Sequence, residues 1–206
     1  MPQDAPALSQ NEINLIAKWI DQGAVWEQHW AYVAPKDDIE APSINSEWGN
    51  NEIDQFVFAQ MSKQNLSPSS EASKETLLRR VFLDLIGLPP TLEEAKLFLN
   101  DSSPNAYESL VDRLLSSPHF GEHWAAMWLD LARYGDSQGY QKDLIRPNIW
   151  RYRDWVIHAF NQDKPFDQFT VEQLAGDLLK APSNNQMLAT AFHRNTNTND
   201  EGGTDN

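Results

Sequence analysis

The sequence contains no cysteine. This absence excludes disulfides, thiolate metal sites, cysteine nucleophiles and the C-x-x-C-H sequence that attaches haem covalently. Long apolar runs are missing too: no stretch of about 18 apolar residues occurs, so the sequence predicts no transmembrane helix. The opening residues, Met-Pro-Gln-Asp, have neither a basic flank nor an apolar run, and no signal peptide is recognisable in them.

Positive charge is scarce. The chain has 16 Lys and Arg against 30 Asp and Glu, which gives a formal net charge of −14. A surface this acidic repels phosphate backbones and anionic lipids, so it argues against nucleic-acid or membrane-surface binding but leaves uncharged ligands such as carbohydrates open. The 40% apolar content, with 8 Trp and 9 Phe, favours a packed core over disorder.

Apolar residues recur with the 3.6-residue period of helices, and no convincing strand alternation occurs. The sequence therefore predicts an all-α fold, an irregular multi-helix bundle with long loops. Capping boxes open three of the expected helices, at Ser9, Thr91 and Thr170. The expected helices cover 9–21, 51–64, 74–86, 91–100, 103–115, 119–134, 148–162, 170–180 and 185–193. The helix at 119–134 is apolar nearly all round, which predicts a central position in the bundle.

Polar side chains are densest between residues 130 and 154. The candidate site residues there are Asp130, Arg133, Tyr134, Asp136, Asp143, Arg146, Arg151, Arg153 and Asp154. Helical spacing places Asp130 on one face with Tyr134 and within reach of Arg133. The preferred interpretation is a structural network that holds the loop 135–147 to two helices. The alternative is a hydrolase in which Asp130 and a second carboxylate act as acid and base.

Metal-binding patterns are weak. His119 and His123 are four residues apart, but H-F-G-E-H does not place its glutamate as H-E-x-x-H does, so structural roles are preferred and no metal site is predicted. His193, beside Arg194 at an expected helix end, has an ordinary explanation as a cation near a helix C-terminus. Residues 199–205 offer oxygen ligands suited to calcium, without the spacing of an EF-hand.

Seven stretches in order resemble one family. They are WIDQGA (19–24), LRRVFLDLIGLPP (78–90), SPHFGEHW (117–124), WLDLARY (128–134), WRYRDWVI (150–157), FDQFTVEQLAGDLL (166–179) and FHRNT (192–196). They are similar to segments of planctomycete-type cytochrome c proteins, which have an N-terminal cytochrome c domain, a middle domain of unknown function and a further C-terminal domain.

The resemblance implies a division of the chain. Residues 1–28 would be the C-terminal remnant of a cytochrome c domain, 29–50 a linker, and 51–206 a helical middle domain truncated at its C-terminus. Met1 falls on the position of the axial haem ligand in the parent protein. The haem-attachment sequences are expected upstream and downstream, so haem c is expected in the parent protein and no cofactor on this chain alone.

The resemblance also implies a function. The chain would be part of an exported, periplasmic or cell-surface c-type haem protein with a role in electron transfer, linked to polysaccharide breakdown. Its expected partners are the missing cytochrome c and C-terminal segments of the same polypeptide, with carbohydrate as a further ligand. Two alternatives stay open: a carboxylate-based hydrolase or carbohydrate-binding domain, and a structural spacer.

Overall fold

The computed structural model describes residues 7–44, 48–139 and 143–196. Within these ranges the regular elements are all helices, and extended backbone pairs only in an isolated bridge between Ser137 and Ile145. The predicted all-α class is therefore confirmed. Two earlier expectations, the axial-ligand position of Met1 and calcium binding by residues 199–205, fall outside the described residues. The helices of the described segments are too short or too polar to cross a membrane.

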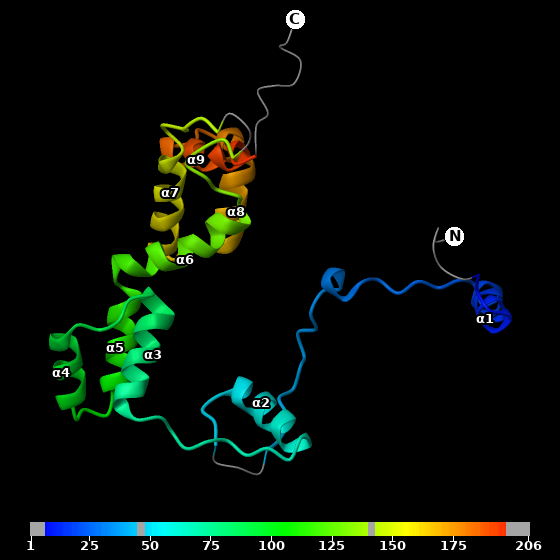
Figure 1. Cartoon of the computed structure of the whole chain (residues 1–206), viewed down its shortest axis with the longest axis horizontal. Coiled ribbons are helices and arrows are strands. Elements are labelled where there is room, and N and C mark those ends of the chain that lie inside the picture. Colours follow the sequence, from blue (N-terminus) through cyan, green and yellow to red (C-terminus); the bar gives the residue numbers. More distant parts are fainter. Residues whose placement is uncertain (1–6, 45–47, 140–142, 197–206) are drawn as a thin grey trace, which may run out of the picture. The chain divides into compact units, whose positions relative to one another are not determined.

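The chain forms two compact units, residues 1–70 and 71–206 (Figure 1). The first contains α1 (Gln10–Asp21), a short 3₁₀ turn (Trp30–Tyr32) and α2 (Glu52–Lys63). At the start of α1 the predicted capping box is present, and the Glu12 carboxylate accepts the Ser9 backbone N–H at 2.7 Å. Neither α1 nor α2 buries any of its residues. The sequence grouped α2 with the domain that follows it, whereas this division groups it with α1.

The second unit begins with α3 (Lys74–Ile86), α4 (Leu92–Asn100) and α5 (Ala106–Leu115). Gly87 ends α3 in the left-handed conformation, with φ of 70°, which a residue without Cβ adopts readily. The predicted capping box at Thr91 starts α4. These three helices share a core made of Leu78, Val81, Phe82, Ile86, Phe98, Ala106, Leu110 and Leu114.

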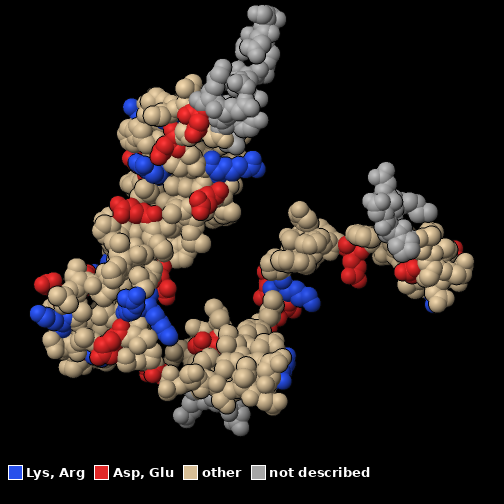
Figure 2. Space-filling model, in the orientation of Figure 1, with Lys and Arg blue, Asp and Glu red and all other residues tan. Residues whose placement is uncertain are grey.

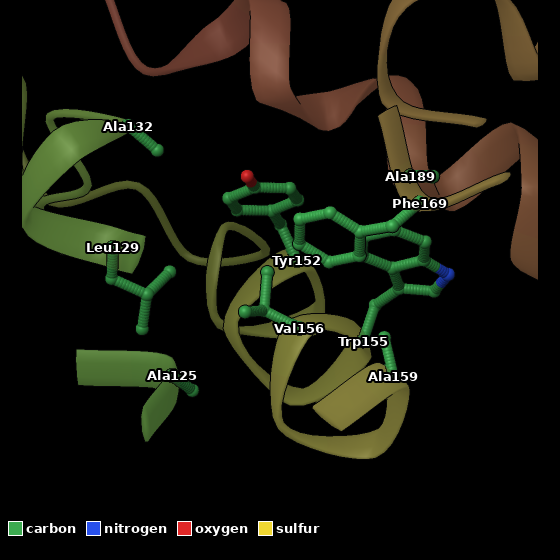
Figure 3. Close-up of a cluster of buried hydrophobic side chains, with 9 residues drawn as sticks. All are labelled: Ala125, Leu129, Ala132, Tyr152, Trp155, Val156, Ala159, Phe169 and Ala189. Atoms are coloured by element: carbon green, nitrogen blue, oxygen red, sulfur yellow. The ribbon is translucent and has the colours of Figure 1, made fainter. Parts of the chain in front are cut away.

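The rest of the second unit consists of α6 (Pro118–Leu131), α7 (Trp150–Asn161), α8 (Phe166–Ala175) and α9 (Asn184–Ala189), with 3₁₀ turns at Gly176–Leu178 and Thr190–Arg194. Figure 3 shows their core, in which the rings of Tyr152 and Trp155 stack and Phe169 of α8 lies over Trp155. On α6, Ala125 and Leu129 face this cluster, and Ala189 closes it from α9.

α6 connects the two cores of the second unit. Its buried side is the small stripe Gly121, Ala125 and Leu129, while Met127 and Leu131 are exposed. The helix is apolar nearly all round, as the sequence indicates, yet only one side of it is buried, because Met127 and Leu131 face solvent. Its central place is nevertheless real, since Phe120 packs against the α3–α5 core and Ala125 belongs to the α6–α9 core.

Several predicted helix boundaries are wrong, and for two of them the structure gives a physical reason. α8 starts at Phe166 after Pro165, four residues before the predicted capping residue Thr170, whose hydroxyl donates to the Phe166 carbonyl inside the helix at 2.7 Å. The expected capping partner, Gln173, is buried in the core. α6 ends at Leu131 rather than at residue 134, because Arg133 adopts the left-handed conformation with φ of 56°.

Candidate functional site

The loop between α6 and α7 holds most of the predicted site residues. Its two arms run side by side: the Arg146 N–H donates to the Asp136 carbonyl at 2.8 Å, and the Gln138 N–H donates to the Leu144 carbonyl at 3.0 Å. The Asp143 carboxylate accepts the Gly139 N–H at 2.7 Å, which also joins the two arms. These bonds hold the two described arms of the loop together without a sheet.

Tyr134 and Asp136 form the shortest side-chain contact of the loop. The Tyr134 hydroxyl donates to Asp136 Oδ1 at 2.6 Å. Partial burial, this hydrogen bond and the negative charge of Asp136 raise the pKa of Tyr134 to about 12, while nearby Arg153 opposes the shift and Asp154 adds to it. At neutral pH the phenol is therefore protonated and acts as a hydrogen-bond donor, not as a base or nucleophile.

Arg153 and Asp154 are the only predicted site residues that form an ion pair within the described ranges. The Arg153 Nη2 and Asp154 Oδ1 atoms are 3.0 Å apart, and Nε of the same guanidinium lies at 3.1 Å. Both side chains are more than two-fifths exposed. An ion pair this exposed adds little stability, because solvent and salt screen it.

Arg146 makes the long-range contacts of the loop. Its two terminal nitrogens donate to the backbone carbonyls of Arg194 at 2.9 Å and Thr196 at 2.8 Å. The guanidinium thereby ties the loop to the segment that follows α9. The sequence predicted that the cluster holds the loop to the helices α6 and α7, whereas this contact joins the loop to the last described segment.

Three predicted residues lie apart from this network. Asp130 and Arg133 are exposed and form no ion pair with each other, since the end of α6 at Leu131 removes the helical spacing that the prediction required. For the same reason Asp130 and Tyr134 do not share a helix face. Arg151 is exposed and lies over the ring of Trp150, 5.5 Å from its centroid.

The carboxylates of this region do not form an acid–base pair. Asp143 has its pKa lowered by hydrogen bonds from Ser137 and the Gly139 backbone and by the charge of Arg146. A general acid at neutral pH needs the opposite shift. Asp154 is already paired with Arg153, and Asp130 lies apart. The arrangement therefore supports a structural loop and gives no support to a hydrolase.

The histidines have ordinary partners. His119 Nδ1 lies 2.7 Å from a Glu122 oxygen within one turn of α6, and His193 Nε2 lies 3.1 Å from the Leu174 carbonyl oxygen. His123 packs edge-on against Trp124. The described segments hold no group of three or more His, Asp or Glu side chains placed to bind a metal ion.

A cleft between α6, α7 and α8, which we call the aromatic cleft, was not predicted from the sequence. It has a volume of about 490 Å³ and is lined by Phe120, Trp124, Trp128, Phe160, Asp163, Lys164, Pro165, Phe166 and Phe169. Three of its rings follow α6 at four-residue spacing, which is the signal that could have revealed it. Lys164 of this lining forms a salt bridge, with its Nζ 3.0 Å from a carboxylate oxygen of Glu172.

Hydrogen bonds and a ring contact hold the side chain of Trp128 in place at the floor of the aromatic cleft. The Trp128 indole N–H lies 3.0 Å from Gln173 Oε1, and the same oxygen accepts the Tyr152 hydroxyl at 2.6 Å. The Trp128 ring meets Phe169 edge-on with 4.9 Å between centroids. At the mouth, Phe166 is 71% exposed. The cleft can accommodate an apolar ring or a sugar face, and Asp163 and Lys164 are the charged groups among its described lining residues.

Comparison of the chain with known proteins finds a match to a protein family. No curated protein and no solved structure matches the chain. Residues 52–206, from the first residue of α2 onward, match the family PSCyt2, described as "Protein of unknown function (DUF1549)". This range covers more than half of the sequence and includes the whole second unit, so the chain belongs to the PSCyt2 family of proteins of unknown function.

Proposed function

We propose that the chain is the helical middle part of an exported, multidomain c-type haem protein, in which it positions neighbouring redox domains without carrying haem itself. The observation that carries the proposal is the uncovered apolar stripe of α1. Ile16 and Ile20 on this stripe are 44% and 57% exposed, and no residue of α1 is buried. An amphipathic helix draws most of its stability from burying such a face.

A cytochrome c domain would supply the missing cover. The resemblance of residues 1–28 to the end of such a domain supports this assignment, and so does the start of the family match at residue 52, which leaves α1 outside the PSCyt2 region. The second unit suits a positioning role because α6 joins its two cores and buried hydrogen bonds fix its shape.

The residues of this chain do not fit a covalently attached haem. Thioether attachment needs cysteine thiols, and the sequence has none. In this proposal the haem groups belong to flanking domains of the same polypeptide, and export follows from c-type haem chemistry. The link to polysaccharide breakdown rests on the resemblance alone.

Haem staining of a denaturing gel tests the proposal. The 206-residue chain and the uninterrupted coding region around it are expressed together with a c-type haem maturation system. The proposal predicts C-x-x-C-H sequences on both sides of the chain and a haem-stained band for the longer protein. A longer protein that lacks both attachment sequences, or that acquires no covalent haem, would contradict it.

The aromatic cleft favours a second candidate function, carbohydrate binding. Sugars stack their apolar faces on aromatic rings, and the exposed ring of Phe166 at the mouth is available for such stacking. The Asp163 carboxylate in the same lining can accept hydrogen bonds from sugar hydroxyls. Titration with cellohexaose and maltohexaose, followed by NMR, tests this role. Phe166→Ala should abolish binding, while Leu178→Ala at a comparably exposed position should not. Absence of binding by the unmodified chain excludes the candidate.

A further inference from the structure

A second hollow, which we call the arginine hollow, is lined by the α6–α7 loop, the start of α7, α9 and the 3₁₀ turn that follows α9. It has a volume of about 650 Å³ and is lined by Gln138, Ile145, Arg146, Pro147, Asn148, Ile149, Arg151, Leu188, Ala191 and Arg194. Three of the eight arginines of the sequence line it, and none of its described lining residues is acidic. Acidic residues outnumber basic ones by 30 to 16 over the whole chain, so this concentration of positive charge is unusual.

Arg146 forms the fixed wall of the arginine hollow. Its guanidinium donates to the Arg194 and Thr196 backbone carbonyls, which hold it in place but carry no net charge. Asp143 is close enough for Arg146 to lower its pKa, yet the two side chains form no ion pair. The positive charge of Arg146 is therefore positioned by the backbone and not neutralised by a carboxylate in contact.

The other two arginines have free hydrogen-bond donors. Arg151 lies over the Trp150 ring, a contact that holds the guanidinium plane but uses none of its N–H groups. The guanidinium of Arg194 has no hydrogen-bond or ion-pair partner among the described residues. By contrast Arg153, two residues further along α7, is paired with Asp154 and does not line the hollow.

The rest of the lining is apolar or neutral. Ile145, Leu188 and Ala191 supply aliphatic surface, and the amides of Gln138 and Asn148 supply further uncharged hydrogen-bond groups. Figure 2 shows that Lys and Arg atoms form only small, separate patches on a surface that is mostly uncharged or acidic. A long polyanion would meet the repulsion of the remaining surface, whereas a small anion would not.

We propose that the arginine hollow binds a small organic ligand in which an oxyanion group, a carboxylate or a sulfate or phosphate ester, is joined to an apolar body. The oxyanion lies against the forks of Arg151 and Arg194 in the field of Arg146, because planar guanidinium groups match two-oxygen acceptors. The apolar body lies on Ile145, Leu188 and Ala191. This inference does not depend on the haem proposal.

Ligand titration followed by methyl and amide NMR tests the inference. The probes are benzoate, phenyl sulfate and phenyl phosphate, with benzamide as the uncharged analogue, at constant ionic strength. At least one anion should shift the signals of Ile145, Leu188 and Ala191, and benzamide should bind about tenfold more weakly or not at all. Comparison of the three anions identifies which oxyanion the site prefers.

Paired variants separate a site from general electrostatics. Arg151→Gln with Arg194→Gln should weaken binding by about tenfold or more, while Arg79→Gln with Arg80→Gln, the same charge change at exposed positions of α3, should leave it within about twofold. Arg151→Lys with Arg194→Lys keeps the positive charge but removes the planar guanidinium groups, so this pair should also weaken binding. It provides a second test in case the glutamine pair does not fold. Equal weakening by the α3 pair, equal binding of benzamide, or no shift with any anion at about 20 mM would overturn the inference.

Discussion

The side-chain amide of Asn161, the last residue of α7, accepts the backbone N–H of Gly121 near the start of α6 at 2.7 Å. Its Nδ2 donates to the Pro118 carbonyl at 3.0 Å, so both ends of one amide are used. Backbone N–H groups at a helix start commonly lack partners within the helix. Here a neighbouring helix supplies the partner, and the absence of a side chain at Gly121 lets the two helices approach.

Replacing Asn161 tests the energy of this contact. Asn161→Ala leaves the partly buried Gly121 N–H without its acceptor, and we expect the free energy of unfolding to fall by about 1–3 kcal/mol. Urea unfolding monitored by circular dichroism measures the change. Gln162→Ala, at the next and exposed position, is the control and should stay within about 0.5 kcal/mol of the parent.

Replacing Gly121 tests the helix approach itself. A Cβ at this position would collide with the Ile157 backbone carbonyl and would lie 2.6 Å from the Asn161 amide carbon. Because one of the obstacles is backbone, Gly121→Ala should destabilise the second unit by about 2 kcal/mol or more, despite the higher helix propensity of alanine. Gly135→Ala is the matched control, since its Cβ would have no neighbour closer than 3.5 Å. Equal stability of the two variants would contradict the predicted packing.

Gln173 tests the buried polar network behind the aromatic cleft. Its carbonyl oxygen accepts from both Trp128 and Tyr152, and Tyr152 is fully buried. Gln173→Ala removes this acceptor and opens space, so we expect a loss of about 2–4 kcal/mol in thermal or urea unfolding. Gln168→Ala, exposed on the same helix, should have little effect. A Gln173 variant as stable as the parent would show that the network contributes nothing.

The raised pKa values of Tyr134 and Tyr152 predict how stability is lost at alkaline pH. Burial raises the pKa of Tyr152 to about 12, and burial with the Asp136 hydrogen bond does the same for Tyr134. Since both folded values lie above the ordinary value of 10.0, the stability they contribute is complete below pH 10 and is lost as the pH rises from about 10 to 12. Absorbance at about 295 nm should show two phenols ionising near pH 12, and each single Tyr→Phe variant should remove one. Ionisation of all five tyrosines near pH 10 would contradict this account.

Local signals predicted the parts of the fold that local interactions determine. The bounds of α3 follow from Ser73 at one end and Gly87 before two prolines at the other, and the structure has them as predicted. The start of α8 was missed because Thr170 and Gln173 have capping-box spacing but Gln173 is recruited to the core. Burial of Gln173 in the core outweighed the local capping-box pattern. Such burial cannot be detected from neighbouring residues in the sequence.

The candidate sites likewise contain contacts between near neighbours, which the sequence can indicate, and long-range contacts, which it cannot. The Tyr134–Asp136 contact joins residues two apart, and the sequence could place both in one polar loop. The contact from Arg146 to the Thr196 carbonyl spans 50 residues, so spacing along the chain gave no indication of it. The aromatic cleft and the arginine hollow are both assembled by such long-range packing. The spacing of three rings on α6 indicates one wall of the cleft, but neither composition nor periodicity places the other walls.

The role of α1 gives the most direct test of the central claim, that this helix completes the core of a neighbouring haem domain. The measurement is thermal unfolding of the full-length protein followed at the haem Soret band. Ile16→Glu, which places a charge on the apolar stripe, should lower the midpoint by several degrees, while Asn14→Glu on the polar face should leave it unchanged. A Soret midpoint that Ile16→Glu does not move, in a protein that carries haem, would contradict the account.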